Sequence, residues 1–176
     1  MENKLNEILN NIHDINYGWI DKDGIKHTQA KKNFFLEFYR LMSVEDTLKY
    51  RVATCFEMAA LVKYYIDLEN IPGDNYIVMY NTDEKIARHA TCVAYLNNAY
   101  YLLENSWILE NPVRKFDTLN ELLLFMIWRF PKMYKIEPLD TNLIEVYKYT
   151  SPAGNLSYKE FIDYVKDNGE KIEVSY

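Results

Sequence analysis

Apolar residues recur at helical spacing in the first part of the chain. They predict a short amphipathic helix near the N-terminus and a second helix after Thr28, which can cap it. The apolar positions of these two helices are Leu5, Ile8, Leu9 and Ile12, then Phe34, Phe35, Phe38 and Leu41. Between them, the sequence Asp-Lys-Asp-Gly at 21–24 predicts a hairpin of residues 17–20 with 25–27, with Gly at the position that needs a positive φ.

A longer helix is predicted to begin at Cys55. Ser43 and Asp46 form a weaker variant of a capping box, which predicts a short helix just before it. The helix at Cys55 has a broad apolar face made of Met58, Ala59, Leu61, Val62 and Tyr65. The sequence Asn-Ile-Pro-Gly at 70–73 ends this helix, because Pro and Gly interrupt helical structure.

Three strands are predicted after this helix. Residues 76–80 are nearly all apolar, as in a central strand. Residues 89–96 and 99–105 form the next two strands, joined by Asn97 and Asn98. Asn tolerates the left-handed backbone of a tight turn, so this pair predicts a two-residue hairpin.

The C-terminal part alternates helices and strands. Two capping boxes, Thr118 to Glu121 and Ser157 to Glu160, each predict the start of a helix. We expect the first helix to run from residue 119 to about 130, where Pro131 ends it, and the second to stop at Asn168 and Gly169. The strands predicted here are residues 134–136, 144–149 and 171–175. No linker or repeat interrupts the chain, so the pattern predicts one α+β domain over residues 1–176, with helices first and an antiparallel sheet after them.

Composition narrows the possible functions. Hydrophobic residues make up 49% of the 176 residues, enough for a sizeable core, and the formal net charge is −6. No basic stripe is present, which argues against nucleic-acid binding. No apolar run approaches the length of a membrane span, and the N-terminus does not resemble a signal peptide. Two cysteines in such a chain favour a reduced, cytoplasmic protein.

Cys55 is the first candidate for chemistry because it stands at the start of an apolar helix. Unpaired backbone N–H groups and the positive end of the helix dipole favour a thiolate at that position, so we expect a lowered pKa. The alternative interpretation is a buried structural thiol, since free Cys is among the most buried residue types.

His89 and Glu104 are brought together by the predicted hairpin. With Asn97 and Asn98 in the turn, paired positions sum to 195, so Glu104 opposes Thr91. Side chains two apart on a strand share a face, so Glu104 lies diagonal to His89 and within its reach. A carboxylate there can orient an imidazole as a base for a thiol. A histidine bonded to backbone and a solvated glutamate are the alternatives.

This segment resembles the transglutaminase-like superfamily. The resemblance is carried by residues 52–60 around Cys55, by Asn-Ile-Pro at 70–72, and by residues 89–104, from His to Glu. It includes Glu57 and Ala59 after the Cys, and an acidic residue fifteen positions after the His. The chain departs from the family pattern at Ala53, Asn70 and Thr91, where the family often has Gly, Gly and Trp, and at Glu104, where Asp is commoner.

The resemblance implies a papain-like fold with its core at about residues 50–107, flanked by N-terminal helices and a C-terminal α/β part. It implies a catalytic triad of Cys55, His89 and Glu104 that cleaves a peptide or carboxamide bond of a peptide or protein substrate, as a cysteine peptidase or amidase does. No cofactor and no metal are implied. The alternatives are a protein-glutamine deamidase or transglutaminase, and a binding module of the same fold without turnover.

Weaker signals point mostly to structure. Asp21 to Gly24 resembles a calcium loop only in part, because most ligand positions are missing. His89 and Cys92 point to opposite faces of a strand, which argues against zinc and makes Cys92 a core residue. Trp107 either shields the His–Glu pair from water or is a plain core residue. Residues 122–128 fit a core helix better than a dimer face.

Overall fold

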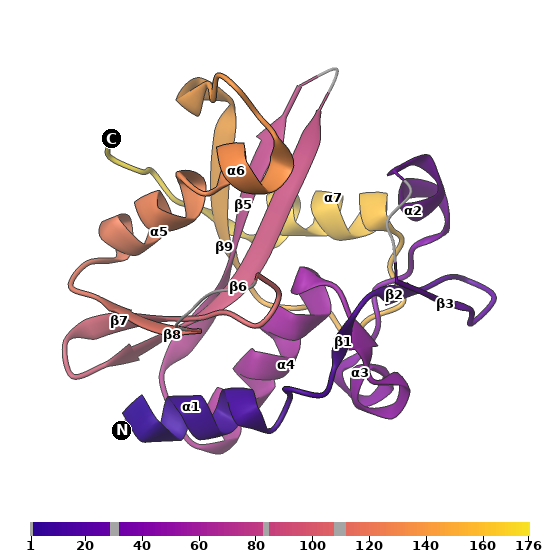
Figure 1. Cartoon of the computed structure of the whole chain (residues 1–176), viewed down its shortest axis with the longest axis horizontal. Helices are drawn as coiled ribbons and strands as arrows, with labels where there is room; N and C mark the ends of the chain where they lie inside the picture. The colour runs from indigo at the N-terminus through magenta and orange to yellow at the C-terminus, as the bar shows by residue number, and fades with distance from the viewer. Residues whose placement is uncertain (1, 29–31, 83–84, 108–111) are drawn as a thin grey trace.

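The structure is a computed structural model in which residues 2–28, 32–82, 85–107 and 112–176 are described (Figure 1). The helices are α1 (Glu2–Asn10), α2 (Lys32–Phe38), α3 (Val44–Tyr50), α4 (Cys55–Leu68), α5 (Leu119–Ile127), α6 (Phe130–Tyr134) and α7 (Tyr158–Asn168), with a 3-10 turn at Thr141–Leu143. The strands are β1 (Asn16–Tyr17), β2 (Trp19–Ile20), β3 (Lys26–His27), β4 (Val52–Ala53), β5 (Gly73–Asn81), β6 (Ile86–Leu96), β7 (Ala99–Leu103), β8 (Val113–Phe116), β9 (Ile144–Tyr149) and β10 (Glu170–Lys171).

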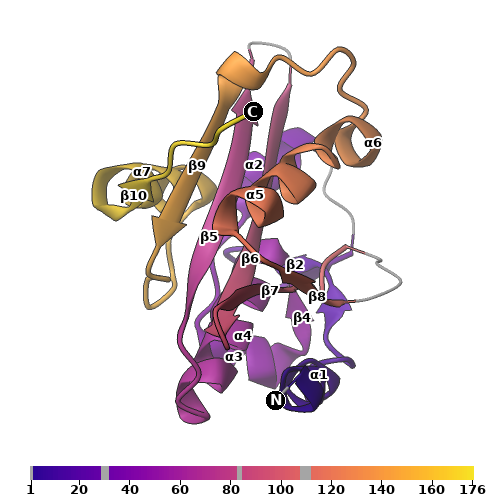
Figure 2. The same cartoon turned by 90° about the vertical axis from the view of Figure 1, so that its left-hand side faces the viewer.

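A six-stranded antiparallel sheet forms the centre of the molecule. Its strand order is β10-β9-β5-β6-β7-β8, and the long strands β5, β6 and β9 lie side by side in Figure 2. The predicted α+β class with an antiparallel sheet is therefore confirmed. Two smaller pairings lie outside this sheet: β2 with β3, which is the predicted N-terminal hairpin, and β1 with β4, which runs parallel.

The β6–β7 hairpin has the predicted register. Leu96 pairs with Ala99 and Cys92 pairs with Leu103, while Asn97 and Asn98 have φ of 51° and 57°. Both turn residues thus adopt the left-handed conformation of a tight hairpin. Because β7 ends at Leu103 and β6 runs on to Ile86, the first part of β6 pairs with β5 alone in the described sheet. His89 lies on this part.

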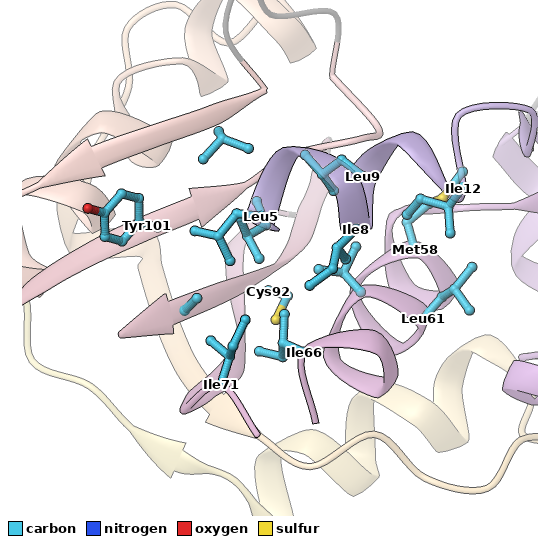
Figure 3. Close-up of a cluster of buried hydrophobic side chains, with 14 of the residues drawn as sticks. Leu5, Ile8, Leu9, Ile12, Met58, Leu61, Ile66, Ile71, Cys92 and Tyr101 are labelled. Atoms are coloured by element: carbon cyan, nitrogen blue, oxygen red, sulfur yellow. The ribbon is translucent and has the colours of Figure 1, made fainter. Parts of the chain in front are cut away.

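One face of the sheet is covered by α1, α4 and α7. Helix α4 packs on the even-numbered residues of β6, such as Cys92, and α1 lies across α4 (Figure 3). The residues of this cluster labelled in Figure 3 are Leu5, Ile8, Leu9, Ile12, Met58, Leu61, Ile66, Ile71, Cys92 and Tyr101. Helix α7 contributes Phe161, Ile162 and Val165 to a second cluster on the same face. The Cys-bearing helix therefore packs on the antiparallel sheet, as predicted.

The opposite face is covered by α5 and α6. Their buried residues pack with the odd-numbered residues of β6 and with Trp107. The helix residues in this cluster include Leu122, Leu123, Met126, Ile127 and Phe130. Residues 122–127 thus belong to the core, as predicted, although Trp128 at the end of α5 is 56% exposed.

Several predicted elements differ from the structure, among them the strand predicted at 99–105, which ends at Leu103. Helix α2 ends at Phe38, before Leu41, and α5 ends at Ile127, while Pro131 lies in the first turn of α6, where the missing N–H of proline is tolerated. Residues 134–136 are no strand, because Tyr134 ends α6 and Lys135 has φ of 54°. The last predicted strand is reduced to Glu170–Lys171. The predicted cap at Thr28 concerns the start of α2, and residues 29–31 there lie outside the described residues.

Candidate active site

Cys55 is the first residue of α4, as the sequence predicts. Its neighbour Thr54 is the N-cap, whose Oγ1 accepts a hydrogen bond from the Phe56 N–H at 3.3 Å. Glu57 completes a capping box by accepting from the Thr54 N–H at 2.9 Å. The Cys55 side chain is 5% exposed and forms no disulfide.

Glu57 ties the start of α4 to the preceding loop. Its Oε2 also accepts from the Thr54 hydroxyl at 2.5 Å, and its Oε1 accepts from the Tyr39 hydroxyl at 2.5 Å and the Met42 N–H at 3.3 Å. The carboxylate is 1% exposed, and four donors satisfy it. The backbone on either side of Cys55 is therefore held by a buried network.

His89 and Glu104 form a buried hydrogen bond. His89 Nε2 lies 2.6 Å from Glu104 Oε2, and both side chains are 1% exposed. The other carboxylate oxygen, Oε1, accepts from the N–H groups of Ser106 at 2.7 Å and Trp107 at 3.0 Å. The predicted contact between His89 and Glu104 is confirmed. Asn105 takes no part, since its amide donates to the Ile12 carbonyl at 3.4 Å on the other side.

Trp107 covers the imidazole. Its ring stacks on His89 with centroids 3.6 Å apart and planes 12° apart, and it also packs against Phe130 in the core. An aromatic ring on this face excludes water from the His89–Glu104 hydrogen bond, which strengthens that bond. Trp107 thus has both of the roles that the sequence left open.

Cys55 reaches β6 one residue beyond His89. The backbone N–H of Ala90 interacts with the Cys55 sulfur, and the two residues pack in the same cluster. His89 and Ala90 point to opposite faces of β6. The Cys55 thiol and the His89 imidazole therefore approach, from opposite faces, the edge of the part of β6 that pairs with β5 but not with β7. The pocket at Cys55 and the pocket at His89 share Tyr17 and Tyr134 as walls. A direct contact between the sulfur and the His89 ring stays a prediction.

The pKa of Cys55 is not lowered, contrary to our expectation. Burial raises the pKa of this thiol to about 12, and the carboxylates of Glu104 and Glu57 act in the same direction. The N–H groups of Ala90 and of Cys55 itself oppose this shift without reversing it. Desolvation at the end of a covered helix therefore outweighs the helix dipole, and the resting side chain is a protonated thiol.

A pocket of about 340 Å³ opens beside Cys55. Aromatic rings dominate its lining: Tyr17, Trp19, Phe35, Phe56, Tyr134 and Tyr158. The smaller pocket at His89 has a volume of about 200 Å³. Tyr134 is held between them by a hydrogen bond from its hydroxyl to the Arg88 carbonyl at 2.9 Å.

The sequence did not single out Tyr17, Tyr134 or Arg88 as site residues. Tyr17 lies near Cys55 because β1 pairs with β4, and β4 directly precedes α4. A parallel pairing of two residues leaves no periodic pattern in the sequence from which it could be predicted. Tyr134 reaches the site through α6, where we predicted a strand. Of these three residues, only Arg88 could have been found from the sequence, because it directly precedes His89 on the same strand.

Cys92 lies in the core, as predicted. It is fully buried between α4 and the sheet, it is not disulfide-bonded, and burial raises its pKa. No group of three or more His, Cys, Asp or Glu side chains suited to a metal occurs in the part of the chain that the structure describes.

Comparison with known proteins adds no relative to this picture. No protein-family model matches the chain, and no curated protein sequence matches it either. Among the described residues, no helix combines the length and apolar character needed to cross a membrane. The interpretation of the site therefore depends on its own geometry.

Proposed function

We propose that the protein is a thiol-dependent acyl hydrolase, a cysteine peptidase or amidase of papain-like, transglutaminase-like type. Its catalytic triad consists of Cys55, His89 and Glu104. The observation that carries the proposal is the buried His89–Glu104 hydrogen bond of 2.6 Å under the Trp107 ring, at the β6 edge that the Cys55 thiol approaches. A dry carboxylate–imidazole pair that could act on a helix-start thiol supports nucleophilic acyl transfer.

The hydrogen bond assigns the two ring nitrogens of His89. A carboxylate can only accept, so Nε2 donates to Glu104 and Nδ1 is left as the basic nitrogen. Because the Cys55 thiol is protonated at rest, its proton passes to Nδ1 as the sulfur attacks the substrate carbonyl carbon and forms the S–C bond. His89 then delivers this proton to the leaving nitrogen as the C–N bond breaks.

Water completes the cycle. It attacks the thioester carbon while His89 accepts its proton, and the C–S bond breaks with return of the proton to the sulfur. Glu104 stabilises the imidazolium in both halves and keeps the ring oriented, since its second oxygen is fixed by two backbone N–H groups. Acids and amines are the only products, so no further reactant is needed.

Two donors are candidates for binding the oxyanion. The Cys55 N–H lies in the first turn of α4, where backbone N–H groups lack helical acceptors. The second is the Tyr17 hydroxyl, on the wall shared by the Cys55 and His89 pockets. Tyr134 shares that wall too, but its hydrogen is already donated to the Arg88 carbonyl. Tyr17 is thus the one of the two that can turn its hydrogen to the substrate oxygen.

A binding module without turnover is the second candidate, and the burial of Cys55 favours it. A thiol that is 5% exposed, with a pKa raised to about 12, is unreactive unless a base takes its proton. The two candidates therefore differ in whether His89 acts on Cys55.

Alkylation of the native protein separates the two candidates. We expect iodoacetamide at neutral pH to modify Cys55 ahead of Cys92, and His89→Ala to slow the Cys55 reaction at least tenfold by removing the base. His27→Ala is the matched control, because His27 also bonds a carboxylate, Asp21, at 2.8 Å and stacks on a tryptophan. Mass spectrometry of the adducts gives both rates. Equal rates for the wild type and the His89 variant would identify the inactive module.

A further inference from the structure

Arg88 gives the Cys55 pocket a positive charge. Among the residues whose side chains the structure describes, it is the only Lys or Arg that lines this pocket, and no Asp or Glu of these residues lines it. The chain as a whole is acidic, with 26 Asp and Glu against 20 Lys and Arg. The described lining of this pocket, with one cation, no anion and many aromatic rings, therefore contrasts with the rest of the molecule.

The guanidinium is held in place without being neutralised. Its NH2 group donates to the Asn81 side-chain oxygen at 2.9 Å, and its charge lies 4.9 Å from the centre of the Tyr158 ring. Arg88 forms no ion pair with an Asp or Glu of the described residues. Its Nε is buried and has no acceptor. A half-buried arginine with donors to spare is a ready binding group for a planar anion.

Arg88 is also close to the reacting sulfur. The Ala90 N–H interacts with the Cys55 sulfur, and Arg88 lies two residues before Ala90 on the same face of β6. Two residues along a strand span about 7 Å. Arg88 and Cys55 line the same pocket, so an anion bound to Arg88 lies in the pocket that opens beside the Cys55 sulfur.

We propose that Arg88 selects substrates carrying a carboxylate a few bonds from the carbonyl that Cys55 attacks. This inference rests on the proposed function, because it concerns the acyl substrate of the same site. The carboxylate accepts from the guanidinium, and the aromatic wall of the pocket contacts the apolar part of the substrate. This charge-assisted pairing discriminates against a neutral amide of the same shape.

Two alkylating agents that differ only in charge test the proposal. Iodoacetate carries a carboxylate where iodoacetamide carries an amide, and both need the same thiolate, so the ratio of their rates at Cys55 is independent of the thiol pKa. We expect Arg88→Gln to lower the iodoacetate-to-iodoacetamide ratio about tenfold, the effect of one hydrogen bond to a charged group. Arg88→Lys keeps the charge and should retain part of the preference.

Arg114→Gln is the control for net charge, because Arg114 lies on β8 over the Phe125 ring at 4.4 Å and outside the pocket. It should leave the ratio unchanged. Circular dichroism and thermal unfolding check that each variant is folded. If Cys55 reacts with both reagents and Arg88→Gln leaves the ratio of the wild type, the inference on Arg88 is wrong while the thiol chemistry stands. If Cys55 reacts with neither, the proposed function itself fails.

Protection by peptides then identifies the source of the carboxylate. Acetyl-Ala-Glu-amide offers an acidic side chain, acetyl-Ala-Ala with a free C-terminus offers a terminal carboxylate, and acetyl-Ala-Gln-amide offers neither. We expect one of the two anionic peptides to slow alkylation of Cys55 by iodoacetamide more than the neutral peptide does, and Arg88→Gln to abolish that difference. Equal protection by all three peptides in the wild type would contradict the proposal.

Discussion

The Cys55 sulfur is exposed to two opposing influences. It lies at the N-terminus of α4, which favours a thiolate, and it is buried among mostly aromatic residues, which favours the thiol. Burial prevails here and raises the pKa to about 12. A site of this kind gains its nucleophile only when a base removes the proton during attack, so the proposed catalysis depends on His89 more than on the helix dipole.

The Tyr17 hydroxyl is expected to bind the oxyanion and to leave the thiol itself untouched. A peptide aldehyde forms a tetrahedral hemithioacetal with Cys55, whereas iodoacetamide reacts at carbon without forming an oxyanion. Tyr17→Phe should therefore weaken aldehyde binding about tenfold and leave the iodoacetamide rate within twofold of the wild type.

Aldehyde affinity is measured as protection of Cys55 against iodoacetamide. Tyr134→Phe is the matched control, because the Tyr134 hydroxyl is occupied by the Arg88 carbonyl at 2.9 Å. Unchanged aldehyde affinity in Tyr17→Phe, or an equal loss in both variants, would remove Tyr17 from the oxyanion site.

For single residues, the sequence predicted which side chains are in contact better than it predicted how deeply they are buried. His89 and Glu104 followed from the two turn residues Asn97 and Asn98, because a hairpin register is a local property. The pKa of Cys55 did not follow, since its burial depends on Tyr17, Tyr134 and other residues from distant segments. The helix-start rule describes an exposed terminus, and this terminus is covered.

Capping boxes fix the helices that surround the site. The structure has three of them, at Thr54, Thr118 and Ser157, in the part of the chain described. All three have the same Ser/Thr and Glu spacing, although only the boxes at Thr118 and Ser157 were predicted. The box at Thr54 differs because its Glu57 is buried and reaches two further donors, the Tyr39 hydroxyl and the Met42 N–H. It thus joins α4 to a segment far from it in sequence.

Glu57→Gln should destabilise the protein more than the same change in an exposed capping box. The amide replaces a carboxylate oxygen that accepts hydrogen bonds with an NH2 group that cannot, so buried donors lose their acceptor. We expect a loss of about 3 kcal/mol in the free energy of unfolding, measured with urea. Glu121→Gln in the exposed box of α5 should cost less than about 1 kcal/mol. Equal losses would show that the buried network contributes nothing beyond capping.

Element boundaries were least predictable where tertiary contacts decide them. β8 escaped prediction because it is only four residues long and has a single buried residue, Val113, which leaves no alternating pattern in the sequence. Pro131 is compatible with either the end of one helix or the first turn of the next, and packing of Phe130 in the core selects the second. Strand β5 was predictable because its apolar run at residues 76–80 is continuous, and β6 because small and apolar residues lead into the turn at Asn97 and Asn98.

The molecule as a whole is a sheet covered on both faces, and this arrangement buries both thiols. Cys55 and Cys92 pack on the α4 face of the sheet, in different clusters. Burial raises the pKa of Cys55 to about 12 and raises that of Cys92 as well, from an ordinary value of 9.0. The folded chain therefore keeps both thiol protons at a pH where the unfolded chain loses them.

The sign of the resulting pH dependence follows from this difference. Below about pH 9 the folded and the unfolded chain both hold the two thiol protons, and the contribution of the thiols to the free energy of unfolding is fully present. As the pH rises from there toward the raised pKa values of the folded state, the thiols of the unfolded chain ionise and this contribution falls. Each thiol should contribute a slope approaching about 1.4 kcal/mol per pH unit. Urea unfolding at pH 8, 9 and 10 in the presence of a reductant measures this slope.

The tyrosines with raised pKa, such as Tyr39 and Tyr149, contribute mainly above pH 10, the ordinary tyrosine value. Cys92→Ala should reduce the decline between pH 9 and 10 by about 1 kcal/mol, whatever it does to the stability at pH 8, because one buried thiol no longer contributes while the tyrosines contribute equally in both proteins. If the variant and the wild type decline equally, Cys92 ionises in the folded state as it does in the unfolded chain, and the close packing of α4 on β6 does not exclude charge from the sheet.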